Sequence, residues 1–253
     1  METSSTEDLL KQIIRHVEPK PSYPIILTGK GSRLETVFNP PLIFPPECRY
    51  EMALMNLETY YSVPNIDESD NSVKIFVKEW HDIHIPTGSY EIKAIEAELK
   101  RQVKKLGGEP KDLTLEPNLS TLKCILTLKN KLKIDFDIAH SIKDVLGFEA
   151  KVFTAGTYSG TKIVSILNVN AILVHCDVIK GSRFNGNEEP IIFSFFPDVP
   201  PGYKLIARPS TLIYLPLTMN VISRMTVWLS DQANRLLDLR EEELTISFHI
   251  RAC

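Results

Sequence analysis

Residues 190–217 read PIIFSFFPDVPPGYKLIARPSTLIYLPL, and this stretch decides the fold. Prolines separate three apolar runs, Ile191–Phe196, Tyr203–Ala207 and Leu212–Leu217. Proline fixes φ and has no N–H, so it ends a β-ladder or stays at its edge. The Pro-Pro-Gly before Tyr203 is typical of a stiff reversal between extended segments. Because no part of the stretch has helical spacing, it predicts the rim of a β-sandwich that offers aromatic side chains to a neighbour.

Two-residue alternation, the pattern of half-buried strands, recurs along the chain. The clearest case is the last run, where Leu244, Ile246, Phe248 and Ile250 alternate with polar residues. In Val221–Leu229 one set of residues, Ile222, Arg224, Thr226 and Trp228, alternates with Val221, Met225, Val227 and Leu229, which predicts another strand. About eight to ten such strands, at spacings typical of sandwiches, favour an all-β fold, a single two-layer jelly roll.

One interior helix is predicted inside this sandwich. It starts at Gly88-Ser89, stops at Gly107-Gly108, and has an apolar face of residues spaced by three and four, Ile92, Ile95, Leu99, Val103 and Leu106. No change of composition marks a second domain. We therefore expect one jelly-roll domain over residues 37–253, with this helix inserted.

The N-terminal residues 1–36 are predicted to form an amphipathic arm followed by a proline-rich connector. Residues 1–18 have helical spacing, with one apolar face made of Leu9, Leu10, Ile13, Ile14 and Val17. Pro19, Pro21 and Pro24 then favour an extended chain. Such an arm either docks on another surface or folds back on its own domain, and the pattern does not separate the two.

Composition excludes several classes of protein. A formal net charge of −3 argues against an electrostatic nucleic-acid binder, and no apolar run approaches the roughly 20 residues of a membrane span. The chain start is acidic and hydroxylic, unlike a signal peptide. The four cysteines are far apart and form no CxxC pair, which favours buried reduced thiols. These features predict a soluble protein made in a reducing compartment.

The search for catalytic and metal-binding patterns is negative, and no cofactor is expected. His81, Asp82 and His84 are the only candidates for a metal or carbohydrate site, and on a strand the two imidazoles would point to opposite faces. The acidic loop at Asp67 to Asp70 lacks EF-hand spacing, so a solvated loop is the default interpretation, with weak cation binding as the alternative. Gly29-Lys30-Gly31-Ser32 is interpreted as a turn and not as a phosphate loop. A non-enzymatic role is therefore favoured.

Four segments in order resemble a known family. They lie at 39–71, 85–99, 140–148 and 188–250, and the most specific parts are PNIDES at 64–69, PPGY at 200–203 and the final hairpin with Asp231-Gln232. The series resembles the minor capsid (penton) proteins of Polinton/Maverick elements and the related adintoviruses. It departs from that pattern at Ala233-Asn234, where a glycine would be expected, and this puts the shape of the hairpin tip in question.

The resemblance implies a jelly roll that assembles into a homopentamer and closes the five-fold vertices of an icosahedral virion, built in the cytoplasm or nucleus of a host cell. Its implied partner is a double jelly-roll major capsid protein, which the N-terminal arm would reach. The length of 253 residues fits a single jelly roll better than a double one. A ring requires each subunit to bury one flank on the next, and the aromatic residues expected there are Phe195, Phe196, Tyr203 and Tyr214. Each of the four is about as well explained as ordinary core.

Two other functions stay open at this point. A domesticated host protein would keep the jelly roll as a binding module, and only the formation of particles would distinguish it from a capsid subunit. A jelly-roll metal or carbohydrate binder would need a pocket of converging polar groups, for which His81, Asp82 and His84 are the candidates.

Overall fold

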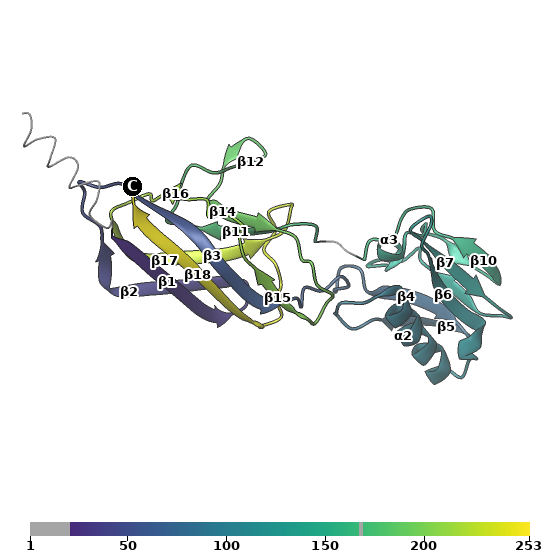
Figure 1. Ribbon diagram of the computed structural model, residues 1–253. Coiled ribbons are helices and arrows are strands. Elements are labelled where there is room, and N and C mark those ends of the chain that lie inside the picture. The colour runs from purple at the N-terminus through teal and green to yellow at the C-terminus, as the bar shows by residue number, and fades with distance from the viewer. Residues whose placement is uncertain (1–20, 167–168) are drawn as a thin grey trace, which may run out of the picture.

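The computed structural model of the chain describes residues 21–166 and 169–253. They form two lobes joined end to end, a β-sandwich that carries the C-terminus at its far end and a smaller lobe that projects from the opposite end (Figure 1). The predicted arm residues Leu9, Leu10, Ile13, Ile14 and Val17 lie outside the described residues, so the arm stays a prediction.

The sandwich has jelly-roll topology. Its eight main strands, in chain order, are β1 (Ser22–Lys30), β2 (Arg33–Ile43), β3 (Tyr50–Tyr60), β11 (Ile172–Cys176), β14 (Ile191–Phe195), β15 (Lys204–Ala207), β17 (Val221–Ser230) and β18 (Glu243–Ala252). One sheet has the order β1-β18-β3-β15, with the short β16 (Leu215–Pro216) also paired to β3, and the other has the order β14-β11-β17-β2. Except for β11 and β14, which pair with each other in one sheet, successive main strands alternate between the two antiparallel sheets, which confirms the expected all-β jelly roll. A two-stranded hairpin, β12 (Arg183–Phe184) with β13 (Asn187–Glu188), extends the loop before β14.

Alternating apolar residues of the two sheets fill the space between them. On β18 the predicted set Leu244, Ile246, Phe248 and Ile250 is fully buried, while Thr245, Ser247, His249 and Arg251 point outward. On β17 a register shift between Ile222 and Arg224 changes the face: Ile222 is buried in the core with Met225, Val227 and Leu229. The predicted grouping of Ile222 with Arg224 was therefore wrong, because a bulge shifts the two-residue period.

The sandwich begins earlier than residue 37. Residues 22–30 pair along their whole length with β18, and residues 33–43 pair with β17. The expected proline-rich connector before residue 37 therefore supplies β1 and the start of β2. Pro24 is tolerated because β1 is the edge strand of its sheet and needs to donate N–H groups on one side only. The turn expected at Gly29 to Ser32 joins these two strands, with Gly31 at a φ of 78°.

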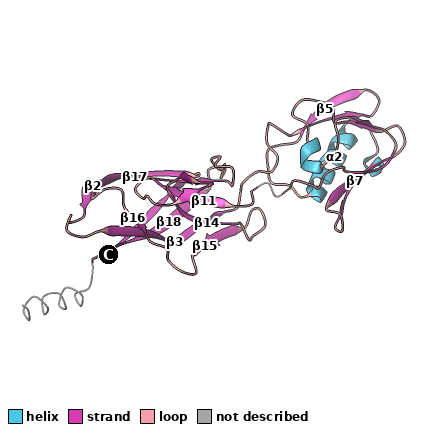
Figure 2. Ribbon diagram, turned by 90° about the horizontal axis from the view of Figure 1, so that it is seen from above, coloured by secondary structure: helices cyan, strands magenta, loops and turns pink. Residues whose placement is uncertain are grey.

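Residues 66–166 form an insertion lobe between β3 and β11. Its elements are β4 (Ser72–Phe76), β5 (Trp80–His84), α2 (Ile92–Lys105), a 3₁₀ turn at Pro110–Asp112, β6 (Leu113–Asn118), β7 (Lys123–Leu128), β8 (Lys133–Asp135), α3 (Lys143–Leu146), β9 (Val152–Phe153) and β10 (Gly156–Ser159). They make two small sheets, β5-β4-β8-β9 and β10-β7-β6, and both helices of the described chain lie in this lobe (Figure 2).

The insertion lobe has a hydrophobic core of its own. The apolar face predicted for α2 is buried there, together with Ile75, Leu113, Leu126, Ile134 and Phe136, and these residues form a cluster separate from that of the sandwich. The single-domain expectation for 37–253 is thus corrected: helix α2 is not packed on the jelly roll but closes a second core. The one-turn helix α3 ends at Gly147, which has the left-handed φ of 77° that favours glycine.

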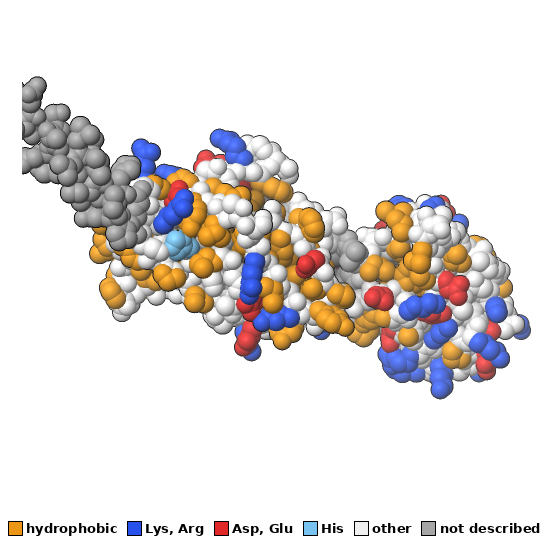
Figure 3. Space-filling model, viewed as in Figure 1, with side chains coloured by type: hydrophobic (Ala, Val, Ile, Leu, Met, Phe, Trp, Pro, Cys, Tyr) orange, Lys and Arg blue, Asp and Glu red, His pale blue; other side chains and the backbone are white. Residues whose placement is uncertain are grey.

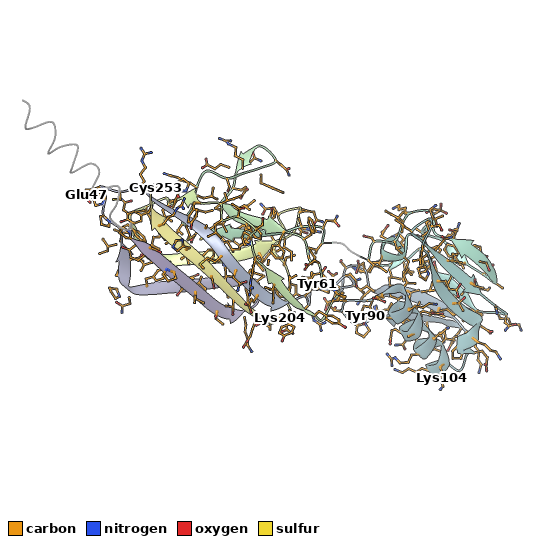
Figure 4. The ribbon with its side chains drawn as sticks, viewed as in Figure 1. Glu47, Tyr61, Tyr90, Lys104, Lys204 and Cys253 are labelled. Carbon is orange, nitrogen blue, oxygen red and sulfur yellow. The ribbon has the colours of Figure 1, made fainter. Side chains whose placement is uncertain are left out.

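Buried Asn65 ties the entry and the exit of the insertion lobe together. Its amide nitrogen donates to the carbonyl oxygens of Tyr90 (2.8 Å) and Ile166 (2.9 Å), and its amide oxygen accepts from the backbone N–H of Tyr90 (2.8 Å). Figure 4 shows Tyr61 of the sandwich and Tyr90 of the lobe near this junction. Removing such a buried amide leaves several polar groups without partners, which costs about 1–3 kcal/mol for each group.

The final hairpin expected with Asp231-Gln232 is not formed, because β17 and β18 lie in different sheets; the connection between them has a tight turn at Asp231 without glycine. The carboxylate of Asp231 accepts from the backbone N–H groups of Ala233 (2.8 Å) and Arg235 (2.9 Å) and from Nε of Arg235 (2.7 Å). These bonds, with burial opposing them, hold the Asp231 pKa below its ordinary value. Asn234 takes the left-handed conformation at a φ of 61°, which asparagine tolerates better than most residues. The departure from the family pattern is therefore accommodated locally.

His175 on β11 is fully buried. Its Nε2 lies 2.7 Å from Oγ of Ser230, its ring stacks on Trp228 at 4.9 Å, and its Nδ1 has no hydrogen-bond partner. Burial lowers the pKa of this imidazole, and the charge of Glu189 opposes that shift only in part. The folded protein therefore holds His175 neutral.

The two cores predict separable effects of core truncation. Leu99→Ala in α2 and Leu57→Ala in β3 each remove a fully buried side chain and should cost about 2–5 kcal/mol. In hydrogen exchange measured by mass spectrometry, Leu99→Ala should speed exchange within 66–166 while the sandwich stays protected, and Leu57→Ala should do the reverse. Equal loss of protection in both lobes from either change would contradict two independent cores.

His175 predicts a loss of stability in acid. Because its pKa is lowered on folding, its contribution to stability is complete above the unfolded pKa of about 6.5 and is lost as the pH falls from that value through the lower pKa of the folded state. Urea unfolding at pH 7.5 and 5.5 should show a smaller pH dependence for His175→Gln than for the unchanged chain. The control is His140→Asn, which removes an exposed histidine at a left-handed position and should keep the original pH dependence. An unchanged pH dependence in His175→Gln would refute the assignment.

Candidate functional site

The proline-rich stretch forms one open side of the sandwich. It contains edge strands of both sheets, β14 and β15, and the loop that joins them. The loop is fixed to the end of β3: Gly202 N–H donates to the Tyr61 carbonyl (2.7 Å), and Tyr61 N–H donates to the Tyr203 carbonyl (2.9 Å). Gly202 has a φ of 85°, which favours glycine at this reversal. The sequence folds here as a stiff rim that holds its side chains in place.

The four aromatic residues predicted for a subunit interface separate into two pairs. Phe196 and Tyr203 are 73% and 65% exposed. Phe195 is half-buried, stacks on Phe193 at 5.8 Å and packs against the sandwich core. Tyr214 is also half-buried, and its hydroxyl lies 2.7 Å from Nδ1 of His249. Only Phe196 and Tyr203 are thus open to a neighbour, and their role in an interface stays a prediction.

Sequence reasoning missed three apolar residues near this rim. Tyr60, Ile206 and Ile213 are all exposed large hydrophobics. The signal was present for Ile206, because Leu205 and Ala207 alternate with it and are buried. We call Tyr60, Phe196, Tyr203, Ile206 and Ile213 the FG flank, because β14 and β15 become F and G when the eight main strands are lettered B to I in chain order.

The opposite open side of the sandwich is also apolar. Its edge strands are β1 and β2, and its exposed residues include Ile26, Val37 and Ile43, with Val221 directly opposite Ile43 in the ladder. We call these four residues the BC flank. Space-filling Figure 3 shows hydrophobic side chains spread over the sandwich, whereas Lys and Arg are frequent on the insertion lobe.

Prolines limit how the edge strands of the BC flank pair with another chain. Pro24 lies within β1, and Pro40 and Pro41 lie within β2. Proline cannot donate a ladder hydrogen bond, and natural edge strands use it to block strand addition. A partner on this side would therefore bind mainly through side-chain packing.

A polar cluster ties the start of β1 to the rest of its sheet. Nε2 of His249 contacts the hydroxyl of Ser22, Nδ1 contacts Tyr214, and the guanidinium of Arg251 lies 3.5 Å from the centre of the Tyr214 ring. Arg251 also pairs with Glu51 at 2.6 Å. These contacts explain why Tyr214 is fixed within its own chain.

The residues considered for metal binding do not converge. His81, Asp82 and His84 lie on β5, where Asp82 pairs with Lys74 (3.5 Å), His84 Nδ1 lies 3.0 Å from Ser72 Oγ, and His81 lies 4.0 Å from Glu79. The loop carboxylates serve the loop itself: Asp67 accepts from the N–H and hydroxyl of Ser69, which lowers its pKa. Within residues 21–166 and 169–253, no three His, Cys, Asp or Glu side chains are placed to share a metal ion.

The buried thiols are poor nucleophiles in this fold. Burial raises the pKa of Cys124 and of Cys176 to about 12. Cys176 points into the sandwich core, while the neighbouring His175 points to Ser230 on the other face of the sheet. The two side chains diverge, so they do not form a nucleophile–base pair. No helix among the described residues is long and apolar enough to cross a membrane.

No family model and no curated protein matches the chain. Among solved structures, the crystal structure of a selenomethionine-labelled mavirus penton protein is similar, with 10% sequence identity and a TM-score of 0.49. The alignment covers 92% of this chain and 100% of that chain. A likeness at this identity and score carries no inference about what this chain does.

Proposed function

We propose that the chain is a structural virion protein, a penton-like minor capsid subunit that assembles into a homopentamer at the vertices of an icosahedral shell. The observation that carries this proposal is the pair of apolar flanks at opposite open sides of one jelly roll. The sequence resemblance to the penton proteins of Polinton/Maverick elements and adintoviruses supports it independently. The proposed role is non-enzymatic.

Two different apolar flanks on one subunit fit a head-to-tail ring better than a two-fold dimer. A two-fold dimer uses the same patch twice, whereas a head-to-tail contact joins two different patches and closes if the rotation between neighbours permits. In the proposed ring the FG flank of each subunit packs on the BC flank of the next. A stable interface of this kind buries about 800 Å² on each partner.

Most of the binding free energy of such a contact would come from a few large apolar side chains. Burying a large apolar side chain completely is worth about 1.5–3 kcal/mol, and aromatic residues near the centre of an interface carry most of the binding energy. Phe196 and Tyr203 are the most exposed aromatics of the FG flank. Val37 and Ile43, each 70% exposed, are the corresponding residues of the BC flank.

The remaining partners follow from the resemblance. A double jelly-roll major capsid protein would surround the pentamer in the virion, and the apolar face of residues 9–17 in the arm would contact it. Assembly would take place inside the host cell. A host protein that had kept the sandwich only as a binding module would share the flanks without forming particles.

The test measures the mass of the native assembly. At micromolar concentration, native mass spectrometry should give five times the chain mass of 28.7 kDa. Phe196→Asp and Val37→Asp should each give monomers, because each places a charge in every junction of the ring. Leu119→Asp, at an 82% exposed position on the insertion lobe, is the matched control and should leave the pentamer intact.

Mixing the two variants separates a ring from other assemblies. Phe196→Asp keeps an intact BC flank and Val37→Asp keeps an intact FG flank, so an equal mixture should form one good junction and a dimer of twice the chain mass. A mixture that stays monomeric would overturn the pairing of these flanks. An unchanged chain that stays monomeric across salt and concentration would overturn the pentamer.

A further inference from the structure

The outer face of a sheet in the insertion lobe carries a row of aromatic and polar side chains. In the sheet β5-β4-β8-β9, Trp80 pairs with Phe76 and Phe76 pairs with Lys133. The buried residues of these strands, Ile75 and Ile134, point to the opposite face, into the lobe core. The row is therefore on the solvent side, away from both the FG and BC flanks.

The aromatic part of this row is held in a fixed geometry. The rings of Phe76 and Trp80 meet edge to face at 5.4 Å, and Nζ of Lys133 lies 5.1 Å from the centre of the Phe76 ring. Trp80 is 39% exposed, so part of its ring is open to solvent beside Phe76. An exposed, ordered tryptophan of this kind offers a flat surface on which a ligand ring can stack.

The next row of side chains on the same face contains both acidic and basic residues. Lys74 pairs with Asp82 at 3.5 Å, and Asp135 lies beside Lys74 in the ladder. The face therefore presents carboxylate acceptors and ammonium donors directly beside the aromatic pair. Such a mixture matches a ligand with many hydroxyl groups, which both donate and accept hydrogen bonds.

A hollow adjoins the aromatic row. Its volume is about 320 Å³, and it is lined by Phe76, Asn130, Lys131, Lys133, Thr154 and Ala155, together with Leu132. The amide of Asn130 is oriented by a hydrogen bond to Asp112 (2.8 Å). Small-ligand pockets start at roughly 300 Å³ and combine apolar walls with a few placed polar groups. This hollow has room for a small ring and has an aromatic wall, an amide, a hydroxyl and two ammonium groups.

We propose that this face of the insertion lobe is a saccharide-binding site, in which one sugar ring stacks on the exposed Trp80 and an adjoining part of the saccharide enters the hollow against Phe76. Asp82, two residues from Trp80 on the same face, then lies beside the stacked ring, Asn130 and Thr154 face hydroxyl groups in the hollow, and Lys131 and Lys133 there favour a sugar that carries a carboxylate. Single-stranded nucleic acid, which also stacks on aromatic rings, is disfavoured because Asp82 and Asp135 repel phosphates and because the chain has a net charge of −3. The site does not depend on the ring proposed for the sandwich.

The test uses saturation-transfer NMR on the full chain with a panel of probes: methyl glucoside, methyl galactoside, methyl mannoside, chitobiose and sialyllactose. At least one sugar should show transfer to its ring protons, and we expect sialyllactose to bind best. Trp80→Ala should reduce the signal at least tenfold, and Lys131→Ala should selectively weaken sialyllactose. Leu119→Ala, an exposed hydrophobic change in the same lobe, is the control and should bind like the unchanged chain.

A second readout checks that tryptophan stacking is direct. The chain has two tryptophans, so Trp228→Phe leaves Trp80 as the only one, and its fluorescence should shift on titration with the bound sugar. Circular dichroism of Trp80→Ala should match that of the unchanged chain, because the side chain lies on the outer face. The proposal is overturned if no sugar binds at 50 mM, if binding survives Trp80→Ala, or if only a twelve-residue oligothymidylate binds. None of these results bears on the mass of the native assembly.

Discussion

The antiparallel pairing of β3 with β18 is the constraint on which the sandwich depends. These two strands lie in the middle of their sheet, pair over almost their whole length, and contribute a large part of the core on one side. A one-residue slip would move Leu244, Ile246, Phe248 and Ile250 to solvent. Because that register is fixed by burial, the strands that flank the pair, β1 and β15, are fixed as the two edges.

The edge strands then determine which side chains the sandwich exposes at its two open sides. A jelly roll has two open sides, and in this chain both carry exposed apolar side chains, while prolines within β1 and β2 discourage strand addition on one of them. The insertion lobe has a different surface, with its aromatic row among charged residues. The two lobes thus differ in the chemistry of their exposed surfaces, apolar at the open sides of the sandwich and aromatic among charges on the insertion lobe. This division of surface chemistry links the proposed assembly to the proposed saccharide site.

Sequence reasoning predicted those parts of the structure that follow from short-range periodicity. The buried face of β18 follows a two-residue period, and helix α2 follows a spacing of three and four residues. The turn before Arg33 is marked by its glycines. The face of Ile222 was not predictable, because a bulge leaves no mark in the hydrophobic pattern. The insertion lobe was missed for a related reason: its strands alternate as the sandwich strands do, and only long-range packing separates the two cores.

The candidate interface was partly predictable for a different reason. Exposed aromatics in a proline-rich rim suggested a contact surface, but Tyr214 is occupied by His249, 35 residues away, and Phe195 by its neighbour Phe193. Those partnerships depend on the fold. The BC flank was missed because the sequence predicts only a short edge segment at residues 42–44, whereas the edge strand β2 begins at Arg33 and includes Val37.

The hydrogen bonds of Asn65 have an evolutionary consequence. Since they hold the first and last residues of the insertion lobe side by side, the jelly roll meets that lobe at what is effectively a single point. Long insertions at such a point add little to the entropy of closing the chain, so the connection tolerates replacement of whatever it carries. A lineage could exchange one inserted lobe for another of unrelated shape while the jelly roll stayed the same, and an engineer could use the same junction to display a foreign domain.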